Sequence, residues 1–328
     1  MAGMLTMAKK EFLDIIGEKK FMLIFATLLI VILVSAYQGG LSYSESQSAT
    51  GSFTFESGQG RGRVGNTTGP VMVFGSAQSL SNSLESMITN FSLVGGVLAI
   101  AISFDTINNE RQRGSLKTLL SYPIYRDSIV YGKYLGGLLA VTMVSVVSFL
   151  GGMGLFISVT GIEMTTDTVL RLAMFFGVSL VYMAIFLAIG LLLSIVLPSP
   201  STSLLASMIV WLSSIQLIPN LGYAIGQILY PVRMTFSQTG EPSFTQQTGF
   251  TTLRTIISGL SPSTAYENIV NSLLTTSSLE FTSGTPTVTS ISVTTALMSS
   301  LPSLLYFVGL LIAIFAAAYV VFMRQEIR

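Results

Sequence analysis

The sequence contains no cysteine and no histidine among its 328 residues. Without cysteine, the chain cannot form disulfides, use a thiolate nucleophile, or bind an iron–sulfur cluster or zinc through sulfur ligands. Without histidine, it lacks the commonest transition-metal ligand and the usual general base of enzymes. Catalysis by a metal centre or a catalytic triad within this chain is therefore not expected.

Charged residues are also scarce, at 9% of the chain, whereas soluble proteins average about 25%. The formal net charge is only +1, so there is no basic field to attract a polyanion, and nucleic acid is not an expected partner. Half of the residues are hydrophobic and the mean hydropathy is +0.71. These values predict an all-α polytopic membrane protein with a single transmembrane domain over residues 1–328.

Six apolar stretches approach or exceed the roughly 20 residues that a helix needs to cross a bilayer. They cover residues 21–37, 88–104, 134–159, 169–197, 203–219 and 301–323. The first could also be a secretory signal peptide. We favour a membrane anchor because its apolar run exceeds the roughly 7 to 15 residues of a signal core and because acidic residues precede it.

Basic residues indicate the orientation of these spans, since Lys and Arg are retained on the cytoplasmic side during insertion. If both termini are inside, 11 of the 16 Lys and Arg residues fall on the cytoplasmic side, including those of the loop between the second and third spans. We therefore expect a multi-pass protein of the plasma membrane, in contact with lipid, with both termini in the cytoplasm.

The segment before the first span is predicted to be an amphipathic helix over residues 4–18 that lies at the membrane interface. Its apolar side chains recur at helical spacing: Leu5, Ala8, Phe12, Ile15 and Ile16. The pattern is compatible with anchoring alone or with a role in transmitting force to the spans.

Two segments predicted to lie outside are rich in small and polar residues, at 38–87 and 220–300. Such composition is typical of solvated loops. The second segment also contains apolar stretches at 221–232 and 253–274, which predict broken helices that are either interfacial or re-entrant. One of them is expected to open at Pro262 after a Ser261 cap.

Arg171 is the only Lys, Arg, Asp or Glu within the six predicted spans. It lies near one end of the fourth span, and we expect its side chain to snorkel to the outer interface. Ion-driven transporters commonly use carboxylates within the membrane. Because the predicted spans contain no Asp or Glu, an external source of energy is favoured.

The loop at 105–133, between the second and third spans, combines an apolar ridge with a charged rim. Leu116, Leu119 and Leu120 lie at i, i+3 and i+4 of a short predicted helix that ends before Pro123. The loop could be a docking site with an apolar centre and a charged rim. It could equally be a charged cytoplasmic loop whose leucines rest on the membrane.

This loop resembles that of type-2 ABC transporter permeases. The resemblance lies in Asn-Glu-Arg-Gln-Arg-Gly-Ser-Leu at 109–116, Leu-Leu-Ser-Tyr-Pro-Ile-Tyr-Arg at 119–126 and Ile-Val-Tyr-Gly-Lys at 129–133. A second segment, Leu-Ser-Pro-Ser-Thr-Ala-Tyr at 260–266, is similar to one between the last two spans of many members. The long outer loops depart from the smaller members of that family.

The resemblance implies a permease that pairs with a second copy, as a homodimer, and binds separate P-loop ATPase subunits, in an arrangement typical of an exporter. It also implies that the loop between spans two and three contains a coupling helix that contacts the ATPase. The residues that match this helix are Glu110, Arg111, Arg113, Gly114, Leu116, Leu119 and Leu120.

The chain itself has no P-loop, since Gly132-Lys133 is followed by Tyr134 and no glycine precedes it at the required spacing. ATP and magnesium are thus expected in the partner, and no cofactor is expected in this chain. One alternative is a membrane scaffold or mechanical transmitter that uses the same ATPase dock but carries no cargo. A hydrolase using Glu241, Glu267 and Glu280 is disfavoured, because nothing in the sequence brings these carboxylates together.

Overall fold

The computed structural model describes residues 2–48, 79–112, 114, 126–162, 164–231, 233–236, 242–245, 248–282 and 285–324. Within these residues, six helical segments are long and apolar enough to cross a membrane. They are Lys19–Ser44, Leu84–Gln112, Asp127–Thr160, Thr166–Val196, Pro200–Leu229 and Val293–Arg324. The six spans predicted from the sequence are confirmed.

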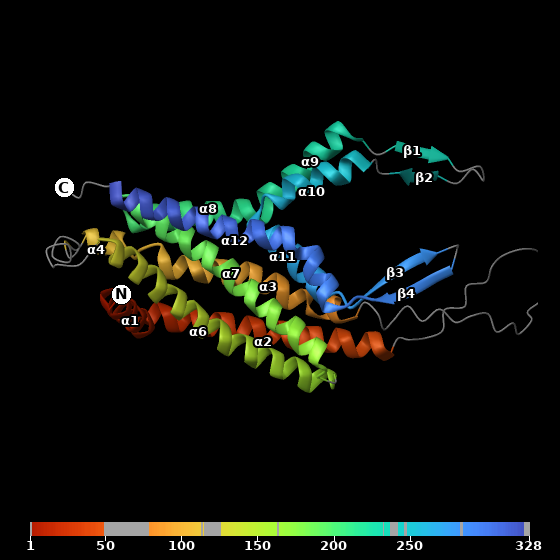
Figure 1. Cartoon of the computed structure of the whole chain (residues 1–328), viewed down its shortest axis with the longest axis horizontal. Helices are drawn as coiled ribbons and strands as arrows, with labels where there is room; N and C mark the ends of the chain where they lie inside the picture. The colour runs from red at the N-terminus through yellow and green to blue at the C-terminus, as the bar shows by residue number, and fades with distance from the viewer. Residues whose placement is uncertain are drawn as a thin grey trace, which may run out of the picture.

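The bundle is built from long helices joined by short ones (Figure 1). The helices of its first half are α1 (Ala2–Gly17), α2 (Lys19–Ser48), α3 (Ser79–Ser103), α4 (Asn108–Gln112), α6 (Arg126–Thr160) and α7 (Thr166–Val196). The second half contains α8 (Pro200–Leu212), the π-helix η1 (Ser213–Leu217), α9 (Ile218–Leu229), α10 (Thr248–Gly259), α11 (Pro262–Leu274) and α12 (Val293–Arg324).

Helix α7 lies at the centre, where it packs against α3, α6, α8, α11 and α12. Its apolar residues are buried on most sides, as expected of a helix that is hydrophobic all round. Phe175 of α7 meets Phe91 of α3 and Phe149 of α6 in an aromatic cluster with ring centroids 5.5 to 6.3 Å apart. This core fixes the relative positions of three spans.

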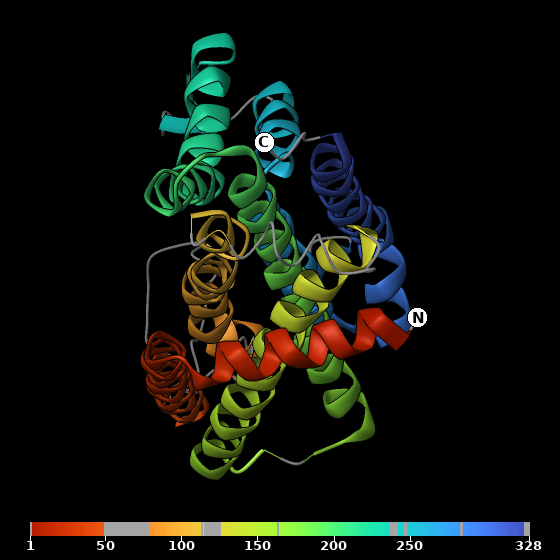
Figure 2. The same ribbon diagram turned by 90° about the vertical axis from the view of Figure 1, so that its left-hand side faces the viewer.

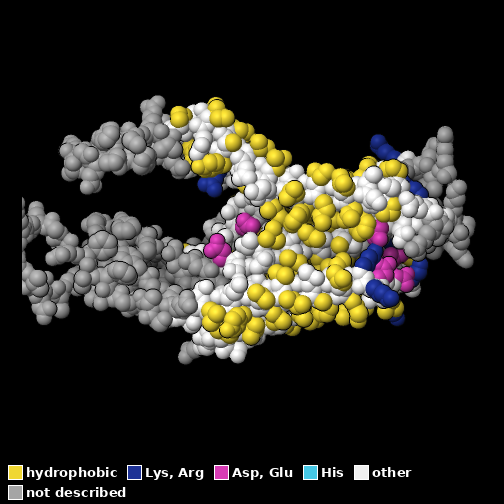
Figure 3. All heavy atoms as spheres, turned by 180° about the vertical axis from the view of Figure 1, so that it is seen from behind, with side chains coloured by type: hydrophobic (Ala, Val, Ile, Leu, Met, Phe, Trp, Pro, Cys, Tyr) yellow, Lys and Arg dark blue, Asp and Glu magenta, His cyan; other side chains and the backbone are white. Residues whose placement is uncertain are grey.

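The two ends of the bundle differ. Helices α1 and α4 and the C-terminal end of α12 lie at one end, which we call the charged end (Figure 1). Helix α1 lies across this end rather than along the bundle (Figure 2). Figure 3 shows hydrophobic side chains over the flank of the bundle, with acidic and basic side chains gathered at the charged end. This distribution is that of a bilayer-spanning protein with one strongly polar face.

Two short antiparallel hairpins lie at the opposite end, which we call the hairpin end (Figure 1). They pair β1 (Arg233–Phe236) with β2 (Pro242–Thr245), and β3 (Ser277–Thr282) with β4 (Thr285–Ser290). The rest of the described secondary structure is helical, as predicted, whereas these four strands were not predicted. Both hairpins fall in the segment 220–300, and Ser and Thr are the commonest residues of their strands.

The fifth span is continuous but changes its winding at η1, which connects α8 to α9. Such π turns occur often at functional sites. Here Ser214 of η1 accepts a hydrogen bond from the backbone N–H of Ser263 (3.1 Å), and its carbonyl accepts one from the Ser261 hydroxyl (2.5 Å). The π turn is thereby joined to the start of α11.

Helices α10 and α11 meet at a sharp turn at the α11 N-terminus. Ser261 caps α11 by accepting from the Thr264 N–H (3.3 Å), and Pro262 occupies the first turn, which confirms the predicted helix start. Tyr306 of α12 donates to the Leu260 carbonyl in this turn (2.8 Å). The turn therefore packs against the bundle, while α9 and α10 extend from it as an arm (Figure 1).

The expectation that Arg171 snorkels to the membrane surface is wrong, because its side chain is only 1% exposed. The guanidinium donates to the carbonyl oxygens of Leu273 (2.6 Å), Thr275 (3.0 Å) and Ile291 (2.6 Å), and it pairs with Asp167 (2.8 Å). The last carbonyls of a helix lack partners within the helix. Arg171 therefore satisfies the end of α11 and also binds the chain on both sides of the β3–β4 hairpin.

Candidate functional site

At the charged end, hydrogen bonds attach α4 and the residue before it to α7. The Ser194 hydroxyl of α7 accepts hydrogen bonds from the backbone N–H groups of Ile107 (3.0 Å) and Asn108 (3.2 Å). These are N–H groups at a helix start, which have no acceptor within the helix. Arg111 of α4 donates in turn to the Ile195 carbonyl (3.2 Å), near the last turn of α7. The start of the loop between spans two and three is thus fixed to the central span.

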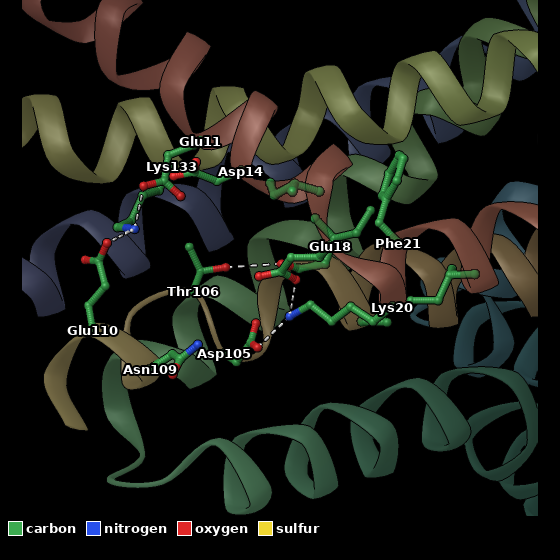
Figure 4. A pocket seen from close by; sticks show the side chains of 14 residues that line it. Glu11, Asp14, Glu18, Lys20, Phe21, Asp105, Thr106, Asn109, Glu110 and Lys133 are labelled. Atoms are coloured by element: carbon green, nitrogen blue, oxygen red, sulfur yellow. Dashed lines mark hydrogen bonds and ion pairs between the residues drawn. The ribbon is translucent and has the colours of Figure 1, made fainter. Parts of the chain in front are cut away.

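A buried ion-pair group joins α4 to two further helices (Figure 4). The Lys133 ammonium of α6 lies 2.9 Å from Glu11 Oε1 of α1 and 2.8 Å from Glu110 Oε1 of α4. The Lys133 side chain is 1% exposed, whereas those of Glu11 and Glu110 are 10% and 19% exposed. A buried ammonium needs such partners, because removing a charge from water costs several kcal/mol.

Two glycines allow α1 to approach α6 closely enough for this contact. A Cβ atom at Gly136 would lie 2.6 Å from the Glu11 Cβ and 3.0 Å from the Ala8 carbonyl oxygen. One at Gly132 would lie 2.7 Å from the Met7 Cγ. Both positions therefore require the absence of a side chain. Lys133 reaches Glu11 because α1 packs directly on the α6 backbone.

A second ion-pair group lies beside the first at the start of α2 (Figure 4). Lys20 lies 2.7 Å from Asp105 Oδ2 and 2.9 Å from Glu18 Oε2, and its ammonium is 5.7 Å from the centre of the Phe104 ring. The Lys20 side chain is 41% exposed, so this group is screened by solvent. It connects the turn between α1 and α2 to the end of α3.

Between the two groups lies a cavity of about 270 Å³ (Figure 4). Five carboxylates line it, from Glu11, Asp14, Glu18, Asp105 and Glu110, against the two ammonium groups of Lys20 and Lys133. The lining is therefore net negative and polar. No set of three or more acidic side chains among the described residues is arranged to hold a metal ion.

Three of the predicted coupling residues lie at this site. Glu110 and Arg111 are on α4 and make the contacts given above. Gly114 follows α4 with φ +73°, a left-handed conformation that glycine adopts at little cost. Arg113, Leu116, Leu119 and Leu120 fall outside the described residues.

Glu11, Lys133 and Ser194 are site residues that were not predicted from the sequence. Glu11 could have been noticed, because it follows Ala8 by three positions and so lies beside the apolar stripe of α1. Lys133 lies between Gly132 and Gly136, which also signals close packing. Ser194 gives no such signal, since it is one of many serines in apolar spans.

Six candidate spans, a crosswise helix and a charged end define a multi-pass membrane protein. A family profile described as ABC-2 family transporter protein matches residues 5–327, so the chain belongs to that family. It is the membrane permease component of an ABC-2 type transporter. Permeases of this family pair with ABC ATPase subunits, which hydrolyse ATP, and they generally bind no cofactor themselves. The chain has no match among curated proteins.

Proposed function

We propose that this permease is one half of a homodimeric exporter in the plasma membrane, with both termini and the charged end in the cytoplasm. Its coupling surface consists of Glu110, Arg111, Arg113, Gly114, Leu116, Leu119 and Leu120. The ATPase docks on this surface, and its movement during ATP hydrolysis passes to the spans through α4.

The observation that carries the proposal is the contact of Lys133 with both Glu11 and Glu110. Through it, a displacement of α4 acts on α1 and α6 at the same time. Ser194 adds the central helix α7 to the same connection. The loop that matches the family's coupling motif is therefore attached to three separate helices at its base.

Two further features support the dimer and the class of cargo. The fifth and sixth spans expose most of their apolar residues in a single chain, with Leu205 at 64% and Leu305 at 66% exposed, so lipid or a second copy must cover them. Apart from Arg171, the predicted spans carry no Lys, Arg, Asp or Glu. An uncharged interior suits lipophilic cargo that enters from the membrane.

The coupling assignment is tested with Arg113→Glu and Leu119→Asp in the permease purified together with its ATPase. We expect either change to lower ATPase binding at least about tenfold, since hot-spot residues of an interface contribute about 2 kcal/mol or more. Lys10→Glu is the matched control, because Lys10 is exposed on α1 outside the predicted surface. If both variants keep full ATPase binding and full stimulated hydrolysis, the assignment is wrong.

The alternative, a mechanical transmitter without cargo, is favoured by one observation, namely that two hairpins and the α9–α10 arm project from the hairpin end (Figure 1). Such projections could contact an external partner. An exporter needs a continuous cavity at the dimer interface, whereas a transmitter does not. A structure of the dimer with its ATPase distinguishes the two.

A further inference from the structure

A large polar cavity lies between the arm and the bundle, away from the charged end (Figure 1). Its volume is about 850 Å³, and it is lined by η1, α9, α10, α11 and α12. Ligand pockets in proteins commonly have volumes of about 300 to 1,000 Å³. The cavity is therefore large enough for a small molecule or for the headgroup of a larger one.

Helix α11 has one face toward the core and another toward this cavity. Polar residues of the helix and its C-cap fall at i, i+3, i+4, i+7, i+8 and i+11 and line the cavity: Thr264, Glu267, Asn268, Asn271, Ser272 and Thr275. The opposite face, which includes Tyr266, Ile269 and Leu273, is buried in the protein core. The helix thus presents its whole polar face to the cavity.

Helix α10 presents a second polar face across the same space. Thr251, Arg254, Thr255 and Ser258 lie at i, i+3, i+4 and i+7, and all four line the cavity. The two facing polar stripes therefore give this space hydrogen-bonding groups on both sides, which suits water or a polar ligand.

The charge of the lining comes from two residues, Arg254 and Glu267. The Arg254 guanidinium lies 5.8 Å from the centre of the Tyr223 ring, in a cation–π contact. Glu267 forms no ion pair with any described residue. Arg254 likewise has no carboxylate partner among the described residues, but it lies against Tyr223, whereas the half-buried Glu267 carboxylate has the like charge of Glu85 near it.

The outer surface of the arm is apolar. Ile228 of α9 is 78% exposed, and Ile256 of α10 and Leu260 beyond it are 64% and 62% exposed. The arm therefore carries exposed hydrocarbon-like side chains as well as part of the polar cavity lining. This combination suits an amphiphile whose tail stays against the arm or the lipid while its headgroup enters the cavity.

We propose that this cavity binds the headgroup of an amphiphilic organic cation, with Glu267 as the counter-charge and the hydroxyl and amide groups of α10 and α11 as hydrogen-bonding partners. The inference rests on the proposed function, because it assigns a class of cargo to the same permease. Glu267 is a ligand-binding residue in this account and has no catalytic role.

The test is calorimetric titration of the purified full-length permease, without its ATPase, in nanodiscs of zwitterionic lipid. The probe is decyltrimethylammonium, whose positive charge does not change with pH, and the heat measured with empty discs is subtracted. We expect saturable binding that Glu267→Gln weakens at least tenfold and Glu267→Asp weakens less. Decyl maltoside, an uncharged amphiphile with the same alkyl chain, should bind equally to the wild type and to Glu267→Gln.

The pH dependence provides a second readout. Burial and the nearby Glu85 raise the pKa of Glu267, while a hydrogen bond from Ser92 opposes the shift. Affinity for the probe should therefore fall as the pH decreases through this raised pKa, because protonation removes the negative charge. Glu267→Gln should show no such dependence.

The other titratable or charged groups facing Glu267 are Glu85 of α3, Arg254 of α10, and the phenols of Tyr182 and Tyr266. Of these, Glu85 is the other carboxylate, and its charge helps to raise the pKa of Glu267. Glu85→Gln isolates its contribution, and this variant should keep the binding and move the pH transition downward.

Two results would overturn the proposal: wild-type binding of the cation no greater than that of empty discs, or equal affinity in the wild type and in folded Glu267→Gln. Neither result bears on the coupling surface, because the ATPase is absent from the experiment. Conversely, if Arg113→Glu keeps full ATPase binding, the coupling assignment fails, but this measurement of cation binding is unaffected.

Discussion

Lys133 and Glu11 lie 122 positions apart in the sequence, yet their charged atoms are 2.9 Å apart and largely buried. The pair joins the crosswise helix α1 to the third span, and Glu110 extends it to the loop that matches the family's coupling motif. A helix that served only as an anchor at the membrane surface would not require a buried ion pair with a span. The pair therefore favours a role for α1 in transmitting movement.

Lys133→Met should destabilise the protein strongly. Removing one member of a buried ion pair typically costs about 3 to 5 kcal/mol, because the remaining charge is left without a partner. Here two carboxylates would lose their contact with the Lys133 ammonium. We expect a clear drop in thermal unfolding temperature in detergent, which Glu11→Gln added to Lys133→Met should partly restore.

Lys20→Met is the matched control for that experiment. Lys20 also contacts two carboxylates, but its side chain is 41% exposed, and exposed ion pairs contribute about 0 to 1 kcal/mol. An equal drop in unfolding temperature in the two variants would show that the burial of Lys133 does not make its ion pairs more stabilising.

Gly136→Ala should disturb the contact between α1 and α6 without changing any charge. The new methyl group would clash with the Glu11 Cβ and the Ala8 carbonyl, and overpacking of this kind costs about 1 to 3 kcal/mol. Gly154→Ala in the same helix has no atom within 4 Å of the new Cβ and should be neutral or slightly stabilising. Unfolding measurements and ATPase stimulation on both variants check this prediction. Identical behaviour of the two would contradict the close packing of α1 on α6.

Arg171→Met should loosen the base of the β3–β4 hairpin, because three backbone carbonyls and Asp167 would lose their donor. Buried acceptors without partners cost about 1 to 3 kcal/mol each. We expect faster amide hydrogen exchange in the residues before β3 and after β4. Asp167→Asn should have a much smaller effect, since the Asp167 side chain is 53% exposed. Unchanged exchange in Arg171→Met would show that the three hydrogen bonds do not stabilise the hairpin.

The proposed orientation can be tested directly because the natural chain has no cysteine and therefore gives no background labelling. Cysteine introduced at Thr248, an exposed position on the arm, should react with a membrane-impermeant maleimide in intact cells. Cysteine introduced at Lys10, exposed on α1, should react only after the membrane is permeabilised. The reverse pattern would place the charged end outside.

The sequence predicted the six spans because each is a long apolar run, a signal that depends on no tertiary contact. It also predicted the start of α11, because Ser261 and Pro262 form a local cap. It failed for Arg171, whose partners are carbonyls that lie more than 100 positions away and carry no signature in the sequence. The same limit applies to Lys133 and Glu11, because side-chain pairing between distant helices depends on how the helices cross.

Docking of an ATPase at the charged end, with transmission of its motion to the spans, is tested most directly by purifying the permease in mild detergent from its native source. Mass spectrometry then identifies the proteins that accompany it and their stoichiometry. We predict one P-loop ATPase subunit per permease, and loss of this subunit when Leu119→Asp is introduced. Reproducible absence of an ATPase, with the permease folded and intact, would contradict the account.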